Sequence, residues 1–271
     1  MNQLLHAGKH VGRGLFHGLA ALGSARTAPP DDPCVAAERL SVALAAIARS
    51  HDIELQVCGD IPRGRALIVA NHVSYFDPVL VLPLCPALPI AKGDVAGWPI
   101  IGGVGRGLGV MFVRRTEPMH RARVLHQVHR VLAAGAAVLN FPEGTTTRGV
   151  EVAPFWRGTF GIAQRLEVPV IPVALRYRDP TMAWFGNATF LPHYWRTVRR
   201  PRVEVSIRFG SPMYPRTGEP PEAMAARARG TIAYMLQNLT WTPRWIDAGT
   251  SVRLSSPRPD PVLPAAGARV R

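Results

Sequence analysis

The sequence lacks any uninterrupted apolar run of the roughly 18 to 20 residues that a membrane-spanning helix needs. The nearest candidate, residues 79–91, is short and contains three prolines. Lys9 and Arg13 are not followed by the apolar stretch that a secretory signal carries. We therefore expect a cytoplasmic protein that contacts a membrane, if at all, without crossing it.

Cysteine is scarce as well. The three cysteines, Cys34, Cys58 and Cys85, form no CxxC pair and, being odd in number, no complete disulfide framework. Thiols used this sparingly fit a reducing compartment, and we assign them no chemical role.

Acidic residues are few relative to basic ones. Asp and Glu total 18 while Lys and Arg total 32, so the formal net charge is +14. This charge predicts an anionic partner, which is a nucleic acid, a membrane surface or a phosphorylated substrate. The sequence shows no RNP-type aromatic strand, zinc-ligand spacing or recognition-helix pattern, so a basic nucleic-acid-binding protein is kept only as an alternative. A nucleotide-binding enzyme lacks support too, since neither GxGxxG nor a P-loop occurs, and residues 102–107 are predicted to form a flexible loop.

Hydrophobic residues are plentiful, at 47% of a 271-residue chain, which is enough for one large domain with a core. Strand-like and helix-like segments alternate. The predicted strands are at 54–57, 66–70, 136–141, 168–175 and 203–209, and the predicted helices at 33–49, 118–134, 158–166 and 221–239. This alternation predicts a single α/β domain whose mixed, mostly parallel sheet is flanked by helices.

Three regions are predicted along the chain. Residues 1–32 form an N-terminal amphipathic helix and linker, residues 33–245 the folded domain, and residues 246–271 a disordered basic tail. Within residues 1–26, apolar side chains recur at helical spacing opposite Lys9 and Arg13, a pattern typical of a basic helix in a bilayer interface. The alternative, a helix packed on the domain, stays open.

The most informative polar pair lies in residues 71–78, which read NHVSYFDP. They follow the predicted strand at 66–70 and therefore lie at the carboxyl end of a strand, where open α/β folds bind ligands. His72 falls in the turn and Asp77 begins the next helix, so the carboxylate can fix the imidazole tautomer and stabilise the imidazolium. The chain has no GxSxG nucleophile elbow, which favours a general base that activates a hydroxyl of the substrate. The plainer alternative is a helix cap beside a loop histidine.

Three further segments stand out. Residues 141–148 read FPEGTTTR and supply backbone amides, hydroxyls and the Arg148 guanidinium, a set suited to an oxyanion or phosphate. Residues 109–115 are predicted to form a strand ending in Arg114 and Arg115. Residues 168–173, VPVIPV, form an apolar strand that either lines a groove or belongs to the core.

In this order the four segments resemble the motifs of the 1-acyl-sn-glycerol-3-phosphate acyltransferase family, within the lysophospholipid acyltransferase superfamily. The family's NHxxxxDP motif is complete at residues 71–78, and its FPEGT motif, followed by Ser or Thr and Arg, matches residues 141–148. Its GxxFI-type strand ending in Arg and its VPI-type strand resemble residues 109–115 and 168–173. The resemblance covers residues 53–210 and implies the glycerophosphate-acyltransferase type of α/β fold.

The resemblance also implies a reaction and a site. A fatty acyl group would pass from acyl-CoA or acyl carrier protein to the free hydroxyl of 1-acylglycerol-3-phosphate, giving phosphatidic acid. His72 would be the base and Asp77 would orient it. The residues implied at the acceptor headgroup are Arg115, Glu143, Gly144, Thr145 and Arg148. No metal or cofactor is implied, and an anionic membrane surface is the expected partner of a peripheral protein on the cytoplasmic face of the cell membrane.

Two features leave the acceptor open. The residue before the motif arginine is often acidic in this family, whereas here it is Arg114. Residues 184–193, WFGNATFLPH, resemble a segment of several bacterial lysolipid acyltransferases, including some that complete ornithine lipids. The carboxylate of an ornithine headgroup suits the same arginines as a phosphate does, so lyso-ornithine lipid is the alternative acceptor.

Overall fold

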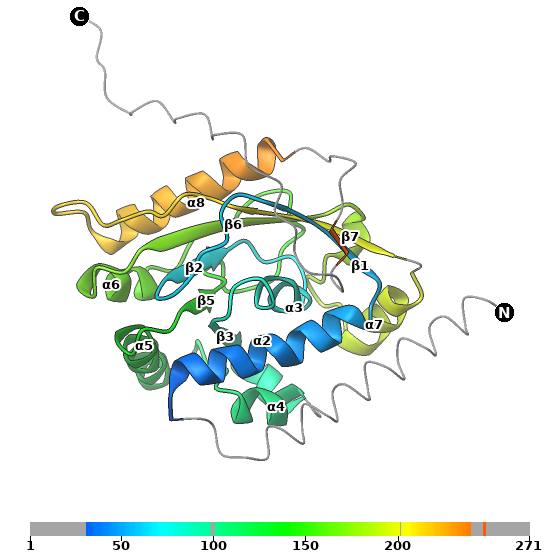
Figure 1. Cartoon of the computed structure of the whole chain (residues 1–271), viewed down its shortest axis with the longest axis horizontal. Helices are drawn as coiled ribbons and strands as arrows, with labels where there is room; N and C mark the ends of the chain where they lie inside the picture. Colours follow the sequence, from blue (N-terminus) through cyan, green and yellow to red (C-terminus); the bar gives the residue numbers. More distant parts are fainter. Residues whose placement is uncertain (1–30, 99–100, 201, 240–245, 248–271) are drawn as a thin grey trace, which may run out of the picture.

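Within the described residues, eight strands form one sheet that is flanked by helices (Figure 1). The computed structural model describes residues 31–98, 101–200, 202–239 and 246–247. The strands are β1 (Ile53–Cys58), β2 (Leu67–Ala70), β3 (Leu88–Lys92), β4 (Met111–Val113), β5 (Val138–Asn140), β6 (Val170–Tyr177), β7 (Val203–Phe209) and β8 (Ile246–Asp247). The α-helices are α2 (Pro33–Arg49), α3 (Asp77–Val81), α4 (Ile101–Gly107), α5 (Pro118–Ala133), α6 (Gly158–Arg165), α7 (Phe190–Val198) and α8 (Pro221–Gln237), and the 3-10 helices are η1 (Gly93–Gly97) and η2 (Pro180–Met182).

The strand order is β4-β3-β5-β2-β6-β7-β1-β8. The neighbours from β4 to β6 are all parallel, β7 is antiparallel to β6, and β1 is parallel to β7. The predicted mixed, mostly parallel sheet is therefore confirmed. Because β2 lies between β5 and β6, the loops that leave the carboxyl ends of these strands meet at one edge of the sheet.

Local signals explain where the helices begin and end. The Asp32 side chain accepts a 2.8 Å hydrogen bond from the Cys34 backbone amide, and Pro33 occupies the first turn of α2. Gly135 adopts a φ of 91° just beyond α5, a left-handed conformation that terminates helices. These caps lie where the sequence predicts them.

Helices lie on both faces of the sheet. α8 packs on β6 and contacts α6, which in turn contacts α5. α2 contacts both α3 and β3. Figure 1 shows α8 above the sheet and α2 and α3 below it.

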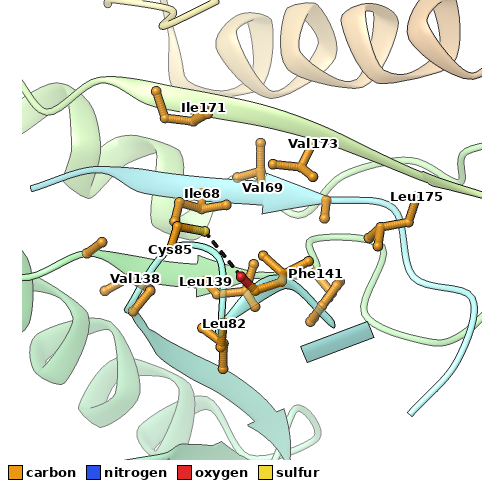
Figure 2. Close-up of a cluster of buried hydrophobic side chains, with 14 of the residues drawn as sticks. Ile68, Val69, Leu82, Cys85, Val138, Leu139, Phe141, Ile171, Val173 and Leu175 are labelled. Carbon is orange, nitrogen blue, oxygen red and sulfur yellow. Dashed lines mark hydrogen bonds between the residues drawn. The ribbon is translucent and has the colours of Figure 1, made fainter. Parts of the chain in front are cut away.

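The core centres on β2, β5 and β6. All four residues of β2 are buried, as are the three of β5. Figure 2 shows their side chains together with Leu82 and Cys85, from the segment that follows α3. The carboxyl ends of these strands are thereby held rigidly, so the loops that follow them start from fixed positions.

The prediction of a flexible glycine-rich loop is wrong, because residues 102–107 all lie in α4. A Cβ atom on Gly102 would lie 2.0 Å from the Ala96 carbonyl oxygen, and one on Gly105 would lie 2.9 Å from the Phe112 ring. These glycines therefore permit close packing of a helix.

Other differences concern elements that the sequence did not reveal. The sequence predicted neither β3 nor α7. Strand β8 pairs with β1, so the sheet includes two residues that the sequence assigned to a disordered tail. The predicted N-terminal helix at residues 1–26 and the rest of the tail lie outside the described residues.

Candidate active site

His72 and Asp77 form the pair that the sequence predicts. His72 follows β2, Asp77 is the first residue of α3, and the distance from His72 Nδ1 to Asp77 Oδ2 is 2.7 Å. The Asp77 side chain is fully buried, whereas 20% of the His72 side chain is exposed. Because Nδ1 is occupied, Nε2 is the imidazole nitrogen left for proton exchange with a substrate.

The Asp77 carboxylate is held on both of its oxygens. Oδ2 also accepts hydrogen bonds from the backbone amides of Val73 at 2.7 Å and Ser74 at 3.0 Å, and Oδ1 accepts one from the Tyr177 hydroxyl at 2.7 Å. Burial raises the pKa of Tyr177, and the adjacent Asp77 charge raises it further, so this hydroxyl stays protonated and donates. These contacts fix the carboxylate that orients His72.

The sequence alone did not identify Tyr177 as a site residue. Its place in the site follows from strand pairing: β2 and β6 are parallel and Ala70 lies opposite Val173, so Tyr177 lies beyond the end of β2. A second contact ties the same elements together, since the Asn71 side chain donates to the Leu175 carbonyl at 3.0 Å and accepts from its amide at 2.8 Å.

The loop after β5 closes over the His72 segment. The His72 ring stacks on Phe141 with ring centroids 4.1 Å apart, and the Thr147 amide donates to the His72 carbonyl at 2.8 Å. The Glu143 carboxylate accepts from the backbone amides of His72 at 2.7 Å and Ala153 at 2.9 Å. Burial raises the pKa of Glu143, and those two hydrogen bonds oppose the shift. Glu143 therefore clamps two loops together, while its implied contact with the acceptor headgroup stays a prediction.

Arg115 lies beside Gly144, as the motif order suggests. Gly144 has a φ of 81°, and a Cβ there would lie 3.0 Å from a terminal nitrogen of Arg115 and 3.0 Å from Trp156 Nε1. Arg115 is half-buried, while the preceding Arg114 is exposed and pairs with Glu117 at 3.3 Å. The arginine that departs from the family pattern thus forms an ion pair with Glu117 at the surface.

Arg148 and Thr145 are both exposed. The guanidinium carbon of Arg148 lies 4.8 Å from the centroid of the Phe185 ring, in the segment between β6 and α7. Arg115 and Arg148 therefore contact different neighbours, and their joint binding of one headgroup stays a prediction.

Residues 184–193 pack on the loop between His72 and Asp77. The Trp184 amide donates to the Val73 carbonyl at 2.9 Å, and the Tyr75 ring makes edge contacts with the rings of Trp184, Phe190 and His193. The Tyr75 hydroxyl also lies 3.0 Å from His193 Nδ1. This segment thus forms an aromatic wall beside the candidate base.

The described part of the chain contains no group of three or more His, Cys, Asp or Glu side chains placed to hold a metal ion. None of its helices combines the length and the apolar character needed to span a membrane. The arrangement contains an imidazole held by a buried carboxylate, with arginines on the adjoining segments, and such groups can activate a hydroxyl beside an anionic group.

Comparisons with known proteins agree with this geometry. The model of the family described as Acyltransferase matches residues 52–176. The chain is 33% identical over 201 residues to the lyso-ornithine lipid O-acyltransferase of Pseudomonas aeruginosa, covering 71% of this chain and 76% of that protein. It is 33% identical over 174 residues to the 1-acyl-sn-glycerol-3-phosphate acyltransferase of Neisseria gonorrhoeae, covering 58% of this chain and 65% of that protein.

A solved structure shares the fold. The crystal structure of the 1-acyl-sn-glycerophosphate acyltransferase from Thermotoga maritima aligns with a TM-score of 0.64 at 21% identity, covering 89% of this chain and 98% of that one. The predicted glycerophosphate-acyltransferase type of fold is therefore confirmed.

Proposed function

Since the chain belongs to the acyltransferase family, we propose that it transfers a fatty acyl group from a thioester donor to the free hydroxyl of 1-acylglycerol-3-phosphate. The donor is acyl-CoA or acyl carrier protein, and the product is phosphatidic acid. The observation that carries this proposal is the 2.7 Å contact between His72 Nδ1 and a buried Asp77, which leaves Nε2 as the base.

The reaction follows from that geometry. His72 Nε2 takes the proton of the acceptor hydroxyl. At the same time the hydroxyl oxygen of the acceptor attacks the thioester carbonyl and forms the new C–O bond. The tetrahedral intermediate collapses, the C–S bond breaks, and the imidazolium returns the proton to the departing thiolate. The Asp77 carboxylate stabilises the imidazolium between these steps.

The acceptor headgroup is assigned to the cationic side of the site. Arg115 beside Gly144 and Arg148 beside Phe185 provide guanidinium groups that bind phosphate in a bidentate manner. The bilayer-soluble chains of the acceptor place the reaction at a membrane surface, which we assign to the cytoplasmic face.

Lyso-ornithine lipid is the second candidate acceptor. The relative named for that lipid aligns with 71% of this chain, against 58% for the relative named for 1-acylglycerol-3-phosphate. A carboxylate headgroup is held by guanidinium groups in the same bidentate manner as a phosphate.

An acyl-transfer assay tests the proposal. Purified full-length protein is incubated with a long-chain acyl-CoA or acyl carrier protein and with each acceptor in turn, and the diacyl product is measured by mass spectrometry. We expect product from at least one acceptor with wild-type protein, and a rate lower by at least about a hundredfold with His72→Ala. Absence of product from both acceptors with both donors would overturn the proposal.

A further inference from the structure

Helix α7 has one buried face and one exposed face. His193, Thr197 and Val198 are buried, and the side chains of His193 and Thr197 lie next to the Tyr75 hydroxyl. On the opposite face, 73% of Leu191 and 43% of Trp195 are exposed. These two large apolar side chains are four positions apart, so they lie next to each other on the helix surface. Leu191 and Trp195 therefore form an apolar ridge that is exposed on the surface of the described residues.

Cationic side chains flank that ridge. Arg196 and Arg199 are exposed, three positions apart and therefore on a shared face beside Trp195. Within the described residues no acidic side chain pairs with either of them, whereas the next arginine, Arg200, is paired with Asp179. The helix itself contains no Asp or Glu. Large apolar groups next to unpaired arginines are typical of a helix that lies in a bilayer interface.

This surface adjoins the candidate active site. Phe190 of α7 and its neighbour Trp184 contact the Tyr75 ring, which lies between His72 and Asp77 in the sequence. Phe185, which is 38% exposed, precedes α7 and contacts Arg148. Helix α7 therefore packs directly on Tyr75, within the loop that joins the candidate base to Asp77.

We propose that Leu191, Trp195, Arg196 and Arg199 form a docking surface for an anionic lipid bilayer. All four residues follow the segment that matches the family model, which ends at residue 176. Leu191 and Trp195 would enter the headgroup region, and the arginines would contact anionic headgroups. The inference rests on the proposed function for its purpose, since it brings the His72 loop to the surface in which a lysolipid is dissolved.

Vesicle binding of the full-length protein tests the surface. The variants are Leu191→Ser with Trp195→Ser, and Arg196→Gln with Arg199→Gln. The matched controls are Tyr214→Ser with Tyr234→Ser, whose rings are 61% and 38% exposed, and Arg123→Gln with Arg130→Gln, two exposed residues of α5. Vesicles of phosphatidylglycerol and phosphatidylcholine are compared with vesicles of phosphatidylcholine alone.

We expect the apolar double variant to lower the partition coefficient on both kinds of vesicle by about tenfold or more, because the two apolar side chains that would enter the bilayer are lost. The arginine double variant should lower it by roughly tenfold on anionic vesicles and leave it unchanged on neutral ones. The control variants should bind like wild type. Equal binding by all variants would overturn the proposal.

A second measurement locates Trp195 directly. Its fluorescence should be quenched by vesicles of brominated lipid, so Trp195→Phe should reduce the quenched fraction while binding is retained. An unchanged quenched fraction would place Trp195 outside the bilayer.

The same surface could instead bind an acidic protein. If the α7 double variants raise the KM for acyl carrier protein without any change in vesicle binding, the surface belongs to that acidic partner and the lipid assignment is overturned.

These outcomes are separable from failure of the proposed function. Vesicle binding and quenching need no turnover, so they report on α7 even if neither lysolipid is a substrate. Conversely, transfer to a short-chain acceptor dispersed as monomers should stay at the wild-type rate in both α7 double variants. Loss of that transfer in a correctly folded α7 variant would assign α7 to the reaction site and overturn a docking role.

Discussion

The Tyr177 hydroxyl donates a 2.7 Å hydrogen bond to Oδ1 of Asp77, whose other oxygen holds the His72 imidazole. Tyr177 and Asp77 are 100 positions apart in the chain, since Tyr177 lies in β6 and Asp77 begins α3. Tyr177 is thus the third member of a chain of contacts that runs from the core to the candidate base, and it acts through Asp77.

Replacing Tyr177 by Phe should lower kcat by about tenfold and leave both KM values near wild type, because the base is oriented less well while the substrate sites are unchanged. The buried Oδ1 loses its hydroxyl donor, so the free energy of unfolding should also fall by about 1–3 kcal/mol. Steady-state kinetics and thermal melts measure the two effects. Tyr75→Phe is the control, since it removes a hydroxyl that contacts His193 and leaves Asp77 intact. A Tyr177→Phe enzyme with wild-type kcat would reduce this residue to a packing role.

His72→Ala should lower acyl transfer by roughly 10²- to 10⁴-fold, the usual loss when a general base is removed. The melting temperature should change little, because the His72 side chain is partly exposed and its backbone contacts with Glu143 and Thr147 remain. Near-normal turnover by this variant would end the proposed mechanism.

The His72–Asp77 pair was predictable because it depends on local order. A buried strand, a polar turn and a helix that starts with Asp-Pro occur within a dozen residues, so the geometry follows from a short stretch of sequence. The strands β2, β5, β6 and β7 were predictable for the same reason, since runs of apolar or alternating residues mark them.

Tyr177 and α7 were not predictable because they depend on tertiary pairing. The role of Tyr177 follows from the register of β6 against β2, which no local pattern reveals. The segment of α7 begins Phe-Leu-Pro-His-Tyr-Trp, and its bulky aromatic residues give a weak helical signal until they pack on Tyr75. The glycines of α4 led to the wrong prediction of a loop at residues 102–107. Close packing, which the sequence does not reveal, outweighs their low helix propensity.

Arg115→Gln should raise the KM for the acceptor by at least about tenfold, since a charge-assisted hydrogen bond to the headgroup is lost, and leave the KM for the acyl donor unchanged. Arg114→Gln is a closely matched control, because that neighbouring arginine is exposed and pairs with Glu117. Steady-state kinetics with acceptor and donor varied separately distinguish the two. A change confined to the donor KM would assign Arg115 to the donor phosphates.

Arg148→Lys tests the second cation in the same assay. The charge is kept while the bidentate guanidinium and its contact with Phe185 are lost, so the acceptor KM should rise more than the donor KM. If the substitution instead lowers the melting temperature and shifts both KM values alike, Arg148 has a structural role.

Gly144→Ala should damage acceptor binding through Arg115. The positive φ of 81° is strained for alanine, which should reduce the free energy of unfolding by about 1 kcal/mol. The added methyl group would also lie 3.0 Å from a terminal nitrogen of Arg115 and from Trp156 Nε1, so the guanidinium must move and the acceptor KM should rise.

Gly218→Ala separates these two effects, because Gly218 has a φ of 70° and no heavy atom within 4 Å of the added Cβ. Both variants should show a similar loss of stability in thermal melts, and only Gly144→Ala should raise the acceptor KM. Since the steric contact and the backbone strain are independent, equal kinetics in the two variants would mean that the position of Arg115 does not govern acceptor binding, whatever the melts show.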